Sequence, residues 1–322
     1  MSDRCRNSIG FIPAGPETFA SSRLQVYLPL QQLLEQHAGS MQLLRRPSRR
    51  RKRLGLFEAA AIYFEVKRRG IGTVVFQKVH KGTAPLLMAL LRSAGTKIVY
   101  VECDYRKRMR FSRHVHAFVA PSERLAQDIR VRTEVPTICI PDPVEFWNRD
   151  SLLTRWQPKK RYRVIWVGHR MNWKQIEDLK RELRAREVDS FDIVTVSNHP
   201  DADVKWSLDA VRAELSRADL AIIPVGSDLR STMKSHNRAT MFMAAGVPVI
   251  VGESPVYEQL VEDGVTGFVF RTVHDLTNLP QRLATAGLVD RVRAAAMERA
   301  KAYSIENVAG AWRQFLTAEA VV

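Results

Sequence analysis

The chain has 322 residues, of which 45% are hydrophobic and 26% charged, and its 50 basic against 34 acidic residues leave a formal net charge of +16. This composition excludes a disordered, a collagen-like and a disulfide-scaffold protein, and the length is enough for about two domains. The excess of basic residues keeps nucleic acid, an anionic membrane surface and phosphorylated ligands open as partners.

The cysteines and the apolar runs bear on the cellular compartment. Cys5, Cys103 and Cys139 form no CxxC pattern, which favours a reducing compartment over a secreted location. The first residues are polar and resemble no signal peptide, and no run of about 18 apolar residues occurs. We therefore expect a cytoplasmic protein, and peripheral attachment to the inner face of the cell membrane stays open.

Short apolar runs alternate with longer stretches of helical period in the first half of the chain. Helices are predicted over 23–37 and 83–94, and a third is predicted to start after Ser122 as its N-cap. The predicted strands of this half are 8–13, 72–77, 97–101, 116–120 and 136–140.

The alternation stops over 141–160, which has two early prolines and a basic cluster, and then restarts. The strands predicted after it are 163–167, 191–196, 220–224, 248–251 and 267–270, and the helices are 175–187, 207–217, 237–245, 256–262 and from about 275 to the end. Nearly continuous apolar strands between helices indicate parallel sheets covered on both faces. We predict an α/β protein with two doubly wound domains facing a cleft, and ligands at the carboxyl ends of the strands.

The most specific pattern lies in residues 234–270. It contains AAGVPVIV over 244–251, a helix end at Gly246 followed by a buried strand, and EQLVEDGVTGFVF over 258–270, which includes a D-G-x-T-G turn. In this order, over about 37 residues, the segment resembles the C-terminal signature of family 4 glycosyltransferases with the GT-B fold. The resemblance implies two Rossmann-like domains.

That resemblance also implies a domain order and an activity. The expected parts are an acceptor-binding domain over 1–145, a linker over 146–160, a donor-binding domain over 161–305 and a C-terminal helix over 306–322 that returns to the first domain. The implied reaction is transfer of a sugar from a nucleoside-diphosphate sugar to a hydroxyl, with retention and without metal or cofactor. A cell-envelope polysaccharide or glycolipid is the expected acceptor, and a small-molecule glycoside is the alternative product.

One departure from the family pattern leaves a second interpretation open. Many members carry two glutamates with seven residues between them before the matched glycine, and here Met233 and Met241 occupy those places. The chain instead matches a subgroup with a K-S-x-N-R entry to that helix, over 234–238. A non-catalytic, nucleotide-sugar-binding partner protein is therefore an alternative to an enzyme.

A diphosphate needs positive charge and backbone N–H groups, which helix N-termini supply. Cations there would also stabilise the departing diphosphate. The expected donor-binding residues are Gly168, Arg170, Lys174, Asp228, Lys234, Ser235, Asn237, Arg238 and Glu258. The competing interpretation is a solvated helix cap with ordinary surface charges.

Polar residues after predicted strands are candidates in the N-terminal half. Asp104 and His80 are expected catalytic residues that orient or deprotonate an acceptor hydroxyl, and Ser22 and Arg23 are expected to bind the acceptor. Residues of these kinds are more often structural or surface residues, so that interpretation stays open for each. No H-E-x-x-H, P-loop or G-x-S-x-G pattern occurs, and no D-x-D is placed to hold a donor metal, so we expect no metal site.

A basic run over 45–53 reads RRPSRRRKR, with seven cations in nine positions. Near an anionic bilayer each cation contributes about 1 kcal/mol, so the run could hold the protein where lipid-linked acceptors are found. The alternatives are a disordered, solvated loop and a nucleic-acid-binding surface. Nucleic acid is disfavoured because no aromatics interleave the run and no known nucleic-acid-binding motif appears.

Overall fold

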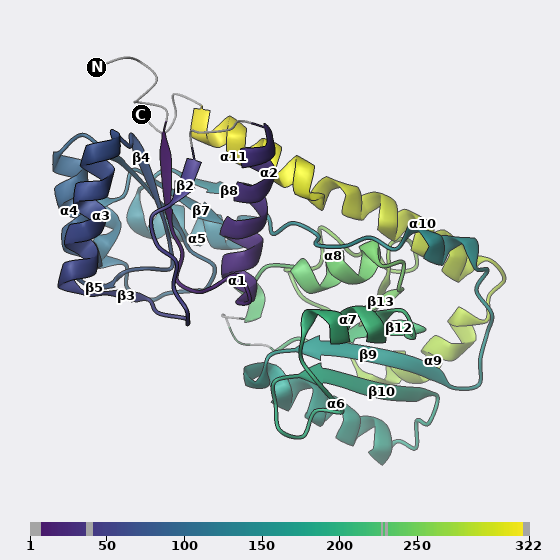
Figure 1. Cartoon of the computed structure of the whole chain (residues 1–322). Helices are drawn as coiled ribbons and strands as arrows, with labels where there is room; N and C mark the ends of the chain where they lie inside the picture. The colour runs from purple at the N-terminus through teal and green to yellow at the C-terminus, as the bar shows by residue number, and fades with distance from the viewer. Residues whose placement is uncertain (1–7, 37–40, 227, 229–230, 318–322) are drawn as a thin grey trace. The chain divides into compact units, whose positions relative to one another are not determined.

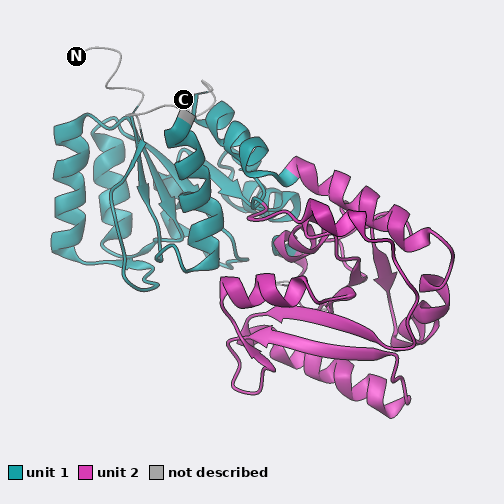
Figure 2. Ribbon diagram, turned by 45° about the vertical axis from the view of Figure 1, so that its right-hand side comes forward, with its two compact units in different colours: residues 1–143, 233–235, 303–322 teal, residues 144–232, 236–302 magenta. Residues whose placement is uncertain are grey.

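The computed structural model describes residues 8–36, 41–226, 228 and 231–317. The chain forms two compact units, coloured separately in Figure 2. Unit 1 comprises residues 1–143, 233–235 and 303–322, and unit 2 comprises 144–232 and 236–302. Each unit contains one six-stranded parallel sheet.

The sheet of unit 1 has the order β2-β1-β4-β6-β7-β8. Its strands are β1 (Ile9–Ile12), β2 (Met41–Leu43), β4 (Thr73–Gln77), β6 (Lys97–Val101), β7 (Ala117–Ala120) and β8 (Thr137–Cys139). The register places Gln77, the last residue of β4, opposite Val101, the last residue of β6. The carboxyl ends of these two central strands therefore lie together.

Helices cover both faces of this sheet, as Figure 1 shows. One core contains Ile62 of α3 and Leu87 of α4 packed with Phe76 of β4, and the other contains Leu30 of α2 and Trp312 of α11. The helical elements are α1 (Ala20–Ser22), η2 (Arg23–Tyr27), α2 (Leu28–Gln36), α3 (Leu56–Arg69), α4 (Ala84–Ser93), η3 (Arg110–His114), α5 (Glu123–Thr133) and α11 (Ile305–Thr317). Burial on both faces explains why the strands read as unbroken apolar runs.

Unit 2 repeats this architecture with the strand order β11-β10-β9-β12-β13-β14. The strands are β9 (Tyr162–Gly168), β10 (Phe191–Ser197), β11 (Val204–Lys205), β12 (Leu220–Ile223), β13 (Val249–Gly252) and β14 (Phe268–Phe270). The helical elements are η4 (Arg149–Leu153), η5 (Arg170–Asn172), α6 (Trp173–Ala185), α7 (Leu208–Leu215), η6 (Ser231–Met233), α8 (Asn237–Ala244), α9 (Val273–Leu283), α10 (Leu288–Ala300) and η7 (Lys301–Tyr303). Two doubly wound parallel sheets are present, as predicted.

One predicted helix, over 256–262, is absent, and that prediction was wrong. The main chain there makes separate turns, with the Tyr257 N–H on the Ser254 carbonyl (2.9 Å) and the Val261 N–H on the Tyr257 carbonyl (2.7 Å). The hydroxyl of Thr266 accepts from the N–H of Glu262 (2.9 Å) and donates to the carbonyl of Leu260 (3.0 Å). The Thr266 hydroxyl therefore pairs with main-chain groups that would form hydrogen bonds within the helix if the helix continued.

The sequence analysis also missed the structure of residues 41–71. That segment contains β2, the short β3 (Arg53–Leu54) and the whole of α3, and β3 pairs with β5 (Lys81–Gly82). In contrast, the predicted N-cap of α5 is confirmed, since the Ser122 hydroxyl accepts from the Leu125 N–H (3.4 Å). Among the described residues no helix combines the length and apolarity needed to cross a bilayer.

Candidate functional site

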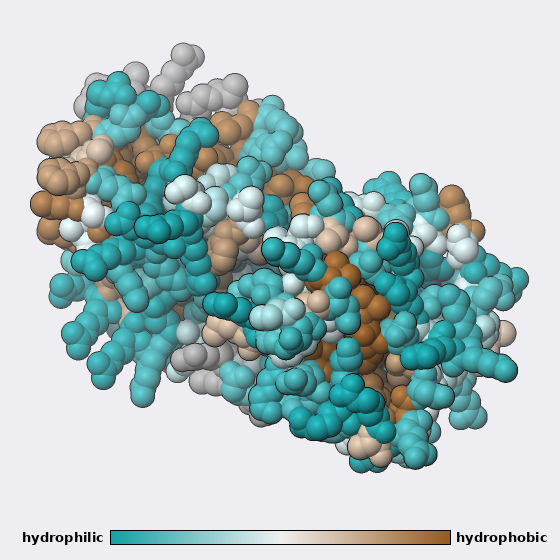
Figure 3. Space-filling model, turned by 60° about the horizontal axis from the view of Figure 1, so that its bottom comes forward, coloured by the Kyte–Doolittle hydropathy of each residue, from teal (hydrophilic) through white to brown (hydrophobic). Residues whose placement is uncertain are grey.

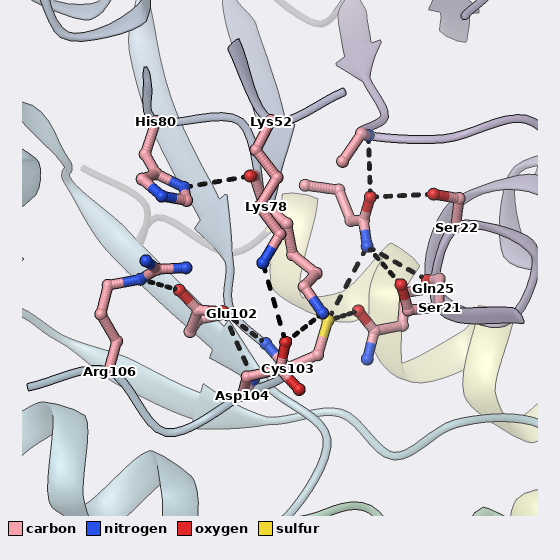
Figure 4. Close-up of polar contacts among 12 residues, drawn as sticks. Ser21, Ser22, Gln25, Lys52, Lys78, His80, Glu102, Cys103, Asp104 and Arg106 are labelled. Atoms are coloured by element: carbon pink, nitrogen blue, oxygen red, sulfur yellow. Dashed lines mark hydrogen bonds and ion pairs between the residues drawn. The ribbon is translucent and has the colours of Figure 1, made fainter. Parts of the chain in front are cut away.

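The site in unit 1 begins where the strand order changes direction. β1 has β2 on one side and β4 on the other, so the strand order reverses at β1. The loop after β1 therefore starts at this reversal point. In open parallel sheets this switch point is where ligands bind. Figure 4 shows the polar side chains that gather there.

Gln77, at the end of β4, holds the loop after β1 in place. Its fully buried carboxamide accepts from the Ala14 N–H (3.0 Å) and the Ser22 hydroxyl (3.1 Å), and donates to the Ser21 carbonyl (3.2 Å). Ser22 in turn accepts from the Gly15 N–H (3.1 Å). The structure therefore gives Ser22, predicted to bind acceptor, a buried positioning role.

Arg23 is also buried, and its guanidinium lies 3.4 Å from the Thr18 carbonyl of the same loop. It starts a π-helical segment, Arg23–Tyr27, in which the side chain of Gln25 is buried. Gln25 donates to Asp142 (3.0 Å) and accepts from the thiol of Cys103. Burial raises the pKa of Cys103, so this sulfur stays a neutral thiol.

The buried Lys78 and the half-exposed Asp104 form an ion pair across the ends of β4 and β6 (Figure 4). Lys78 is 3% exposed and adopts a left-handed backbone with φ of 58°, which is uncommon outside glycine. Burial opposes its charged form, but the Asp104 and Glu102 carboxylates outweigh burial and raise its pKa. Burial likewise disfavours the Asp104 carboxylate, but Lys78 lowers its pKa overall. Asp104 is therefore a paired anion and a weak proton acceptor; its catalytic role stays a prediction.

Glu102 fixes the main chain next to this ion pair. Its carboxylate is fully buried and accepts from the N–H groups of Cys103 (3.1 Å) and Asp104 (3.3 Å). The other oxygen binds the Arg106 guanidinium at 2.7 Å. A buried carboxylate is retained only with such compensation, and here it fixes the main chain that carries Asp104.

His80, the second predicted catalytic residue, is held by the protein. Its Nδ1 lies 3.0 Å from the Lys78 carbonyl and 2.9 Å from the Tyr100 hydroxyl, and its ring stacks on Phe111. Burial, then the charge of Arg106, lowers its pKa to about 4. The imidazole is neutral at physiological pH, and general-base catalysis by it stays a prediction.

The basic run is an ordered part of this site, so its interpretation as a disordered loop was wrong. Arg45 is buried, and its guanidinium donates to the carbonyls of Pro13 (3.1 Å), Arg51 (2.8 Å) and Arg53 (3.2 Å) and pairs with Glu58 (2.8 Å). The Arg51 N–H donates to the carbonyl of Ala14, in the loop after β1. Arg45 is thus a structural clamp and is not part of a surface that could meet a membrane.

Unit 2 has a second switch point, between β9 and β12. A Cβ at Gly168 would lie 2.2 Å from the Trp166 ring, so this strand end requires glycine. The Arg238 guanidinium reaches the Val167 carbonyl (3.4 Å), and the Arg170 N–H donates to Asn198 (2.8 Å). The structure therefore brings Gly168, Arg170 and Arg238 together at the end of β9.

Three other predicted donor residues have local partners or face solvent. Lys174 is exposed on α6 and pairs with Asp178 (2.8 Å). Asp228 accepts from the N–H (3.1 Å) and the hydroxyl (2.6 Å) of Ser231, the first residue of η6. Glu258 is exposed in the turns that replace the predicted helix. Donor binding by these residues stays a prediction.

The segment before α8 carries the remaining predicted donor residues. Lys234, Ser235 and Asn237 are half-buried there. Sequence reasoning passed over His236, the N-cap of α8, whose pKa burial lowers to about 4. It also passed over Gln77, Lys78 and Glu102, although each directly follows or ends a predicted strand. Within the described ranges, no three His, Cys, Asp or Glu side chains lie together as a metal site.

No protein-family model matches the chain, and no curated protein matches its sequence. Its fold, however, is similar to solved structures at low identity. A glycosyltransferase from Rickettsia africae is 12% identical and matches 96% of this chain and 97% of its own with a TM-score of 0.69. Anabaena HepE, with UDP and glucose, is 13% identical over 96% and 98%, with a TM-score of 0.63.

TarM from S. aureus is 11% identical over 81% of this chain, with a TM-score of 0.60, and the chain spans 58% of the length of TarM. These matches extend over both doubly wound units of the chain. At this identity they establish architecture. The chain therefore has the GT-B fold of nucleotide-sugar glycosyltransferases.

Proposed function

We propose that the chain is a glycosyltransferase that moves a sugar from a nucleoside-diphosphate sugar to a hydroxyl acceptor. The observation that carries the proposal is the whole-length likeness of fold to glycosyltransferases, one of which was solved with UDP and glucose. The expected acceptor is a cell-envelope polysaccharide or a glycolipid, and a small molecule is the alternative.

In the proposed reaction, the bond from the anomeric carbon to the β-phosphate oxygen breaks, and a bond from that carbon to the acceptor oxygen forms. The hydroxyl proton leaves with the nucleoside diphosphate, whose phosphate assists the attack in a retaining transfer. Arg238 lies at the N-terminus of α8, beside the end of β9. A guanidinium and a helix N-terminus stabilise the charge that develops on the diphosphate.

Thermal unfolding with UDP, GDP, dTDP and ADP, each added separately, tests the donor site. One nucleotide, at a hundred times its Kd, should stabilise the protein by about 2.7 kcal/mol. Arg238→Ala should abolish this gain, whereas Arg184→Ala, an exposed arginine of α6, should keep it. No gain with any nucleotide, together with a salt-sensitive gain with duplex DNA, would refute the proposal and favour nucleic-acid binding.

A second candidate is donor binding without turnover, because Met233 and Met241 replace the family's paired glutamates. Met233 is buried in the apolar core of unit 1, a place that does not suit a carboxylate. Release of nucleoside diphosphate from the matching nucleotide sugar separates the two candidates. Stabilisation by a nucleotide without any release would favour the binding protein.

We further propose an anionic bilayer as a partner surface, through the outer faces of α3 and α4 rather than through Arg45. Phe57 is 89% and Phe64 69% exposed on α3, and Leu86 and Leu90 are exposed on α4. Hydrophobic side chains gather along the edge of the molecule where these helices lie (Figure 3). An apolar patch of this kind marks an interaction surface in a monomer.

Cations flank the α3–α4 patch, which favours a bilayer with anionic lipids over a neutral one. Lys67 and Arg68 follow Phe64 on α3, and Arg53 precedes the helix; all three are exposed. Co-sedimentation with phosphatidylglycerol-containing vesicles should fall in a Phe57→Ser, Phe64→Ser double variant. Val131→Ser, at an isolated exposed valine of α5, should have no effect. Equal sedimentation of all three proteins would contradict the bilayer proposal.

A further inference from the structure

Lys52 is held rigidly at the mouth of the unit 1 site. Its carbonyl accepts from the N–H groups of His80 (3.1 Å) and Lys81 (2.9 Å), through the pairing of β3 with β5. Arg45 binds the carbonyls on either side of it, at Arg51 and Arg53. These main-chain contacts fix where the Lys52 side chain starts, beside the end of β4.

The ammonium of Lys52 shares the Asp104 carboxylate with Lys78. Asp104 is paired with Lys78, and Lys52 Nζ stays 4.0 Å from the same Asp104 oxygen. The Glu102 carboxylate forms an ion pair with the Arg106 guanidinium at 2.7 Å. The two carboxylates of this site therefore already have closer cations, and the positive charge of Lys52 is in excess.

The pKa of Lys52 is consistent with this excess of positive charge. Burial, then the charges of Lys78 and Arg50, lowers its pKa to about 8, although Asp104 and Glu102 oppose the shift. Arg50, two residues before Lys52, is exposed, and its guanidinium stacks on the Phe19 ring at 4.7 Å. An anion placed here would restore the charged form of Lys52.

We propose that Lys52, with Arg50 beside it, binds a phosphate group carried by the sugar acceptor. The inference rests on the proposed glycosyltransferase function, and it narrows the acceptor to phosphorylated molecules. Lys52 keeps 24% of its side chain exposed, whereas Lys78 keeps only 4%. A dianionic phosphate gains charge-assisted hydrogen bonds from two such cations.

A phosphate here could also come from the donor diphosphate, and the experiment separates the two sources. Inorganic phosphate is titrated into the full chain by calorimetry at pH 8, in two buffers of different ionisation enthalpy, with and without saturating UDP. We expect binding with proton uptake, because the anion raises the pKa of Lys52, and a Kd that UDP leaves unchanged. Displacement by UDP would assign the phosphate to the donor and overturn the proposal.

Two variants test whether Lys52 binds the phosphate. Lys52→Gln should weaken phosphate binding by at least about tenfold and abolish the proton uptake. Arg49→Gln removes an exposed charge of the same basic run and should change neither quantity. Equal binding by Lys52→Gln and the parent would overturn the proposal. Failure of the glycosyltransferase function would appear separately, as the absence of nucleotide stabilisation, and would leave this titration interpretable.

Discussion

Replacing the buried Arg45 by methionine should lower the free energy of unfolding by about 3 kcal/mol. Methionine keeps the length of the side chain but leaves the carbonyls of Pro13, Arg51 and Arg53 without their donor. It also removes the partner of Glu58. The basic run would then lose its attachment to the loop after β1, so the loss should be local as well as global.

Denaturant unfolding measures the global loss, and amide hydrogen exchange measures the local one. The Arg51 N–H, which donates to the Ala14 carbonyl, should exchange faster in Arg45→Met. Arg49→Met removes an exposed arginine four residues away and should cost less than about 0.5 kcal/mol. If both variants lost the same stability, Arg45 would not be the clamp that the contacts indicate.

The sheets were predictable because their strands are buried on both faces. Runs such as 163–167 and 220–224 are apolar at every or nearly every position, and burial of β9 and β12 on both faces explains that pattern. The helix α3 was not predicted for the opposite reason, because several of its large apolar side chains are exposed. Phe57 and Phe64 face solvent, which obscures the helical period, and β3 has only two residues.

The unit 1 site was predictable only in part. Asp104 and His80 follow predicted strands, and the parallel topology brings those strand ends together whatever the intervening sequence. Lys52 comes from the basic run over 45–53, which predicted a charged surface but no secondary structure, and the pairing of β3 with β5 places it beside Asp104. Ser22 is buried and donates to Gln77, from a distant strand, and its contact with an acceptor stays a prediction.

Gln77→Leu should cost about 3 kcal/mol of unfolding free energy, because it leaves two buried donors unpaired. The Ala14 N–H and the Ser22 hydroxyl both depend on its side-chain oxygen, and leucine of similar volume supplies none. The leucine fits the site by size, so the loss reports the hydrogen bonds rather than a cavity. The loop after β1 should detach from β4 first.

Chemical denaturation of Gln77→Leu beside Gln314→Leu tests this expectation. Gln314 is exposed on α11, so the same substitution there changes no buried hydrogen bond and should cost less than about 0.5 kcal/mol. The proposed nucleotide site is in unit 2, so nucleotide stabilisation should survive in Gln77→Leu while phosphate binding at Lys52 weakens. Unchanged stability of Gln77→Leu would mean that water replaces the amide, and the switch-point loop would then need another anchor.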